Sequence, residues 1–188
     1  MRRGLILSVV ALAALAVVAL ADVVFVYTGQ LSVNPTSAPL TFTTGPNAGP
    51  SSTSAEPYIN FTGTNSGFTV SLVVTNSYAV YYYEAGELTV NTAGYIYVNS
   101  ISISGSAVNT MTIYIAPSSS PNSYTCTFTI ISGGAAASTP SSTCSLGAGT
   151  YYIHIYVAPN LPVSSTSTEA VTVSFGYDVN TNAAVPVP

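Results

Sequence analysis

Most of the chain alternates between apolar and hydroxylated residues with a period of two, a pattern typical of half-buried β-strands. In segment 68–74 every even position is apolar, and Thr69 and Ser71 lie between them. Strand-like runs of this kind cover residues 38–44, 58–62, 78–83, 87–91, 95–104, 110–115, 125–130, 150–158 and 171–179. Turn clusters such as Asn65-Ser66-Gly67 separate the runs. The pattern predicts an all-β fold, an antiparallel two-sheet sandwich of jelly-roll type with about nine strands.

The same pattern divides the chain into segments. Residues 58–180 are expected to form one β-sandwich body, without an internal repeat or a second domain. Residues 34–57 are rich in Pro, Ser, Thr and Gly and are predicted to be a linker. Residues 181–188 end in Val-Pro-Val-Pro and are predicted to be an extended tail, because proline fixes φ and removes a hydrogen-bond donor.

Residues 1–21 have the features of a secretory signal peptide. Arg2 and Arg3 form a basic start, an apolar stretch follows, and the segment ends in Ala-Leu-Ala at Ala21. We therefore expect cleavage between Ala21 and Asp22 and an extracellular protein, with membrane contact only through the uncleaved leader.

An alternative is cleavage at Gly4, as in a pilin-type leader. Residues 5–27 would then form a helix long enough to span a bilayer or to build a filament core. Against this, Asp22 would lie inside an apolar helix, which is costly in lipid. Residues 23–27 are also β-branched and aromatic, which favours a strand.

Residues 22–33 form a candidate N-terminal strand with one apolar face. That face consists of Val23, Phe25, Tyr27, Leu31 and Val33, interrupted by Gly29, which indicates a bulge or a close backbone approach. One interpretation makes it the first strand of its own sandwich, since sequential strands usually neighbour one another. The other makes it a donor strand that fills a groove of a neighbouring copy by β-strand addition and so builds an open filament.

Charge narrows the possible functions. Only 4% of the 188 residues are charged, and no Lys or Arg follows Arg3. Loss of the leader would leave six acids and no basic side chain except His154, a net charge of −6. Nucleic-acid binding, which depends on Lys and Arg, is therefore excluded. A surface of hydroxyls, amides and tyrosines favours packing against copies of the same chain.

The Ala-Leu-Ala leader end, the short apolar strand and the charge-poor, Ser/Thr/Tyr-rich β body together resemble the archaeal bundling pilins. These are similar to the TasA and camelysin-like matrix proteins of bacterial biofilms. The resemblance implies a structural subunit of a bundling pilus or biofilm fibre, a homopolymer in which residues 22–33 act as the donor strand. Two alternatives remain: a type IV-like pilin with a helical core, and an exported carbohydrate-binding module.

Cys126 and Cys144 are the only cysteines, and an exported chain meets an oxidising environment. We expect a disulfide that closes the Gly/Ala/Ser-rich loop between two strands. Nearby His or basic partners for a thiol site are missing from the sequence. Asn60 lies in the only N-glycosylation sequon, Asn-Phe-Thr, and is a glycosylation candidate.

No motif assembles a catalytic site, so we expect no enzyme activity, no cofactor and no metal. His154 is the sole histidine; Ile153 and Ile155 should face the core, which places His154 at the surface or an interface. Glu84 and Glu87 are expected to be solvated acids at a turn. Of the three tyrosines 81–83, alternation directs at least one into the core, and the others could stack on a sugar.

Overall fold

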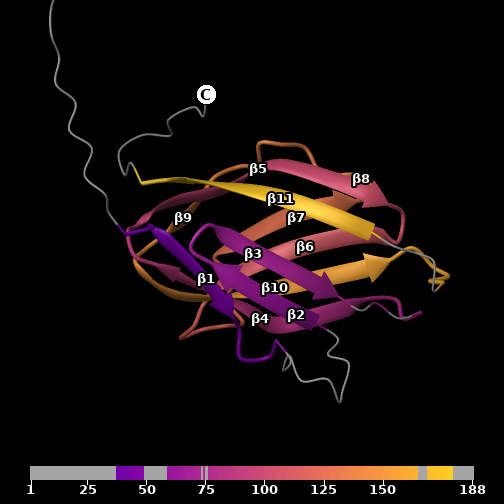
Figure 1. Ribbon diagram of the computed structural model, residues 1–188, viewed down its shortest axis with the longest axis horizontal. Coiled ribbons are helices and arrows are strands. Elements are labelled where there is room, and N and C mark those ends of the chain that lie inside the picture. The colour runs from indigo at the N-terminus through magenta and orange to yellow at the C-terminus, as the bar shows by residue number, and fades with distance from the viewer. Residues whose placement is uncertain (1–36, 49–58, 73, 75, 165–168, 180–188) are drawn as a thin grey trace, which may run out of the picture. The chain divides into compact units, whose positions relative to one another are not determined.

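The computed structural model describes residues 37–48, 59–72, 74, 76–164 and 169–179. Eleven β-strands and no helix occur in these residues, and every strand pairing is antiparallel (Figure 1). The prediction of an all-β antiparallel sandwich is confirmed.

The larger sheet has six strands in the order β1-β4-β10-β6-β7-β8. These strands are β1 Leu40–Thr44, β4 Val80–Val90, β10 Gly149–Pro159, β6 Val108–Pro117, β7 Cys126–Ser132 and β8 Ala135–Ala136. Alternating apolar residues form its inner face, where Leu88, Ile130 and Val157 are fully buried. The apolar face of this sheet therefore forms one side of the hydrophobic core.

The opposite layer is made of two separate smaller sheets. One is the hairpin β2 (Ile59–Thr64) and β3 (Gly67–Leu72), closed by the predicted Asn65-Ser66 turn. The other has the order β11-β5-β9, with β11 Glu169–Asp178, β5 Gly94–Gly105 and β9 Cys144–Leu146. β3 and β11 lie side by side over β6 and β10 but are not hydrogen-bonded to each other (Figure 1).

The disulfide Cys126–Cys144 is confirmed, and the two strands that flank the loop it closes belong to different sheets. It joins β7 of the six-stranded sheet to β9 of the three-stranded sheet, with 5.8 Å between the two Cα atoms. The bond therefore connects the two layers of the sandwich across the core.

Two predicted boundaries need correction. Strand β1 confirms the strand-like run 38–44 but lies inside residues 34–57, so part of the predicted linker belongs to the six-stranded sheet, where β1 pairs with β4. The predicted turn between Glu84 and Glu87 is absent, because β4 runs continuously through both residues. The chain passes this point by a local bulge with Glu84 at a positive φ of 51°. The predicted signal peptide, the donor strand and residues 181–188 lie outside the described residues.

Candidate functional site

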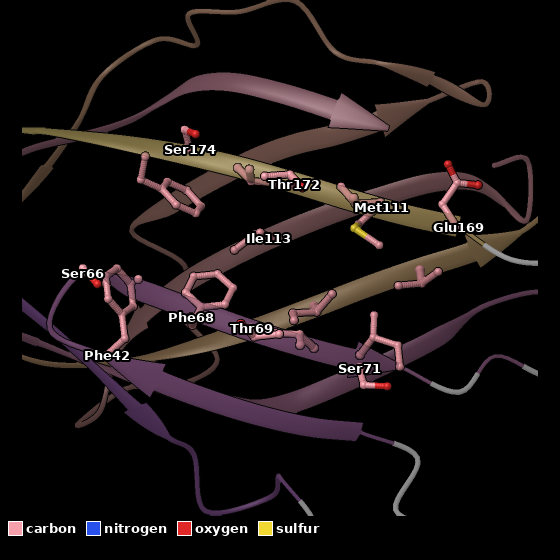
Figure 2. Close-up of a pocket in the computed structure, with 18 of the residues that line it drawn as sticks. Phe42, Ser66, Phe68, Thr69, Ser71, Met111, Ile113, Glu169, Thr172 and Ser174 are labelled. Carbon is pink, nitrogen blue, oxygen red and sulfur yellow. The ribbon is translucent and has the colours of Figure 1, made fainter. Parts of the chain in front are cut away.

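A groove of about 900 Å³ separates β3 from β11 (Figure 2). Its two walls are these strands, and its floor is formed by side chains of the six-stranded sheet. The apolar floor residues are Met111, Ile113, Ile155 and Val157, and Leu40 and Phe42 contribute from β1. The volume is at the upper end of the range for ligand pockets. Six residues of β3 and eight of β11 line it, so the groove runs along the strands and is elongated.

Both walls are sheet edges in the described part of the chain. β3 pairs with β2 on one side, β11 pairs with β5 on one side, and their other sides face the groove. An open edge presents a row of unpaired N–H and C=O groups, which is a template for another strand. β3 and β11 run in opposite directions, since residue numbers rise along β3 where they fall along β11 (Figure 2).

The walls alternate in a way that leaves apolar surface uncovered. On β3, Phe68, Val70 and Leu72 are half-buried against the core, and Thr69 and Ser71 are exposed. β11 repeats the pattern: Val171, Val173 and Phe175 are half-buried, and Thr172 and Ser174 are exposed. These apolar side chains point toward the core but are still partly exposed to solvent. The second layer of the sandwich therefore leaves apolar surface uncovered along the groove.

A row of aromatic rings crosses the groove near one end. The Phe68 and Phe175 rings lie 5.9 Å apart between centroids, from opposite walls. Phe68 also stacks on Phe61 at 4.8 Å, and Phe175 contacts Phe128 at 6.0 Å. We call these four residues the phenylalanine row. Of these four residues, Phe68 and Phe175 line the groove, so its lining is aromatic on both walls at this end.

Glu169 lies at the other end of the groove and is the only charged residue among the described residues that line it (Figure 2). Its Oε2 accepts a hydrogen bond from the backbone N–H of Val108 at 3.3 Å. The residue begins β11 and is half-buried. One end of an otherwise uncharged groove is therefore negative.

A second cluster lies on the outer face of the six-stranded sheet, around His154. The rings of Tyr81, Tyr83 and Tyr124 lie 4.8–5.9 Å from the imidazole. The Tyr81 and Tyr124 hydroxyls are 2.9 Å apart. These tyrosines cover His154, whose exposed fraction is 0%. The prediction of a surface or interface histidine is therefore wrong, because side chains of β4 and of the loop before β7 bury it.

A β-bulge positions this histidine. Opposite the single residue His154, β4 has three residues, since Ile153 pairs with Gly86 and Ile155 pairs with Tyr82. The bulge turns the Glu84 N–H toward Nδ1 of His154, and it donates a hydrogen bond of 3.0 Å. Nδ1 is thus the acceptor and Nε2 carries the proton of the neutral ring. Within the described residues Nε2 has no hydrogen-bond partner.

Burial dominates the electrostatics of this cluster. It lowers the pKa of His154 from its ordinary value, and the nearby Glu84 carboxylate offsets part of that shift. Burial raises the pKa of Tyr82, the tyrosine that points into the core, to about 12. Desolvation, followed by the Tyr124 hydroxyl, also raises the pKa of Tyr81. Burial therefore favours the neutral form of the imidazole.

The remaining predicted residues do not converge on a site. Asn60 is exposed on β2, between the buried Ile59 and Phe61, so its side chain is accessible. Glu84 lies within β4 and not at a turn, and Asn47 Nδ2 donates an exposed hydrogen bond to its Oε2 at 3.2 Å. Glu87 is half-buried within β4. The proposed donor residues and the cleavage position at Ala21 and Asp22 lie outside the described residues.

Across the described ranges, no group of three or more His, Cys, Asp and Glu side chains is placed to bind a metal ion. The same residues contain no helix of the length and apolarity that a bilayer crossing requires. No protein-family model matches the chain, and a search of curated proteins finds no significant match.

Proposed function

We propose that the protein is a structural subunit of an extracellular filament, and that residues 22–33 of one copy fill the groove of the next. The observation that carries this proposal is the elongated apolar groove bounded by two open sheet edges of opposite direction. One inserted strand would complete the second layer as β2-β3-strand-β11-β5-β9. It would hydrogen-bond to both edges and cover the half-exposed side chains.

The donor segment suits the groove in length and in pattern. The six residues of β3 span about 20 Å, and the twelve residues 22–33 exceed that length. In an inserted strand, Val23, Phe25 and Tyr27 point to one face, which would lie on the apolar floor. Of the alternate residues, Thr28, Gln30 and Ser32 would continue the polar outer surface of β3 and β11, whereas Val24 and Val26 would add two apolar side chains to it.

A contact of this kind is heterologous, because each copy gives a strand at one place and accepts one at another. Repeated contacts of this type produce an open filament when the rotation does not close into a ring. The described body offers little charge repulsion between neighbouring filaments, which favours lateral bundling. The same strand folded back into its own groove would instead give a monomer.

Val173→Asp tests the proposal. Val173 is half-buried on β11 and lines the groove, so a carboxylate there would lie beneath the inserted strand. We expect this variant to stay monomeric by analytical ultracentrifugation while the unchanged mature chain forms high-mass, denaturant-resistant material. The matched control is Ala170→Asp, which adds the same charge at an exposed position of β11 that does not line the groove. Assembly of both variants alike, with native circular dichroism, would contradict strand insertion.

A second candidate function is carbohydrate binding on the tyrosine cluster. Tyr81 and Tyr124 are 40% and 45% exposed, and their rings and paired hydroxyls suit stacking on a sugar. This function predicts a monomer retained on a glycan column, with retention lost in Tyr124→Ala. Filament assembly without retention would exclude it.

A further inference from the structure

We propose that the inserted strand has one polarity and one register, set by Gly29 at the phenylalanine row and by its α-ammonium group at Glu169. The strand would run antiparallel to β3 and parallel to β11. This inference rests on the proposed function and on cleavage after Ala21, and it adds which residues of the acceptor select the end and the position of the donor.

Gly29 is the one position of the donor's apolar face without a side chain. Phe68 and Phe175 meet across the groove at 5.9 Å and occupy the floor where they meet. A side chain pointing down at that point would have to displace the rings, whereas glycine leaves only backbone above them. The row and the gap in the apolar face are complementary, which places Gly29 between Phe68 and Phe175.

Charge indicates the polarity. After cleavage the chain has no Lys or Arg, so the α-amino group of Asp22 and His154 are its only basic groups, and an α-amino group is mostly protonated at neutral pH. Glu169 is the only charged residue among the described residues that line the groove. The Asp22 side chain belongs to the outward set of the strand, so its carboxylate points away from the floor. The ammonium therefore pairs with Glu169 at the rim.

The two contacts agree on a single register. If Gly29 lies beside Phe175 and the strand runs parallel to β11, residue 23 lies beside Glu169, and the terminal ammonium is next to it. The same register places residue 25 beside Leu72 of β3, another half-buried wall residue. In the opposite polarity, Gly29 at the row would send the N-terminus past the other end of β11, away from Glu169.

Engineered disulfides read out this register. Antiparallel pairing with β3 places Thr28 opposite Thr69 and Val26 opposite Ser71, and these β3 residues are exposed. Each double cysteine variant of the mature chain, Thr28→Cys with Thr69→Cys and Val26→Cys with Ser71→Cys, should give a covalent ladder on a non-reducing gel after mild oxidation by a diamide reagent. Linked monomers instead of a ladder would mean that each strand fills its own groove, which contradicts the filament.

Two further pairs report the opposite polarity. With Gly29 at the phenylalanine row and the strand parallel to β3, Gln30 lies beside Thr69 and Ser32 beside Ser71. We expect the pairs Gln30→Cys with Thr69→Cys and Ser32→Cys with Ser71→Cys to remain unlinked. A ladder from these pairs, but not from the first two, would overturn the register and leave strand insertion standing. High-mass material that forms with no ladder from any pair would overturn the register, and Val173→Asp would then decide whether a strand is inserted at all.

The contact between the α-ammonium and Glu169 is tested by a double-perturbation cycle, which combines chemical modification of the α-amine with Glu169→Gln. Because the mature chain has no lysine, acetylation modifies the α-amine and removes its charge, whereas reductive dimethylation keeps the charge and serves as the control. Acetylation or Glu169→Gln should each raise the critical concentration for assembly about threefold, as for a partly exposed ion pair. The two changes together should raise it no further. Glu87→Gln, outside the groove, should have no effect; additive effects of acetylation and Glu169→Gln would overturn the ion pair.

Discussion

The disulfide between the two layers should contribute a measurable share of the stability of the subunit. Cys126 and Cys144 are 18 residues apart, and closing a loop of this size contributes about 3 kcal/mol in the chain-entropy model. For a chain of this length each kcal/mol moves the melting temperature by about 2–4 °C. The double variant Cys126→Ala with Cys144→Ala should therefore melt about 6–12 °C lower.

Urea denaturation of the unassembled subunit, followed by circular dichroism with and without a reducing agent, checks this value. Reduction and the double variant should lower the midpoint by similar amounts and raise the slope, because the unfolded chain without the bond is less compact and exposes more surface. The control is reducing agent added to the double variant, which should change nothing. A loss of less than about 1 kcal/mol would refute the reasoning that the bond restrains the unfolded chain.

Two other perturbations probe the packing around the site. The pKa of His154 is lower in the folded chain, so as the pH falls the unfolded chain binds a proton at this residue before the folded chain does. The free energy of unfolding should therefore be independent of His154 above about pH 6.5 and decrease below it. His154→Asn, which keeps an acceptor near the Nδ1 position, should flatten that part of a pH series of thermal melts, and an unchanged slope would exclude His154 as the cause. Gly86→Ala should destabilise the subunit by about 1–3 kcal/mol, because a Cβ there would meet the Phe61 ring. Gly147→Ala is the control, since a Cβ at that position makes only ordinary contact, and equal losses in urea denaturation would contradict the packing argument.

The period-two alternation was sufficient to predict most strands because each has one face on the core. It failed at β4, where Glu84, Gly86 and Glu87 resemble a turn in composition. Their conformation depends on the strand opposite, since the bulge forms around a histidine 70 residues away. The short strands β8 and β9 were missed because two or three residues are too few to show a period.

Alternation also predicted that His154 lies on the opposite face of the strand from Ile153 and Ile155, but it did not predict that other side chains bury it there. Its burial comes from Tyr81, Tyr83 and Tyr124, which reach it from other parts of the chain. The groove could not be predicted from the sequence for a related reason. It exists because β3 and β11 are edges that face each other, and sheet order cannot be read from the residues of either strand. The donor pattern was visible in the sequence; its acceptor needed the fold.

A reconstruction of the filament by electron cryo-microscopy tests the central claim most directly. The account predicts one strand of density in the groove between β3 and β11, with residues 22–33 continuous with a neighbouring copy. Gly29 should lie over the Phe68–Phe175 contact and the chain start beside Glu169. A filament whose groove is empty, or whose subunits are joined by a bundle of N-terminal helices, would contradict it.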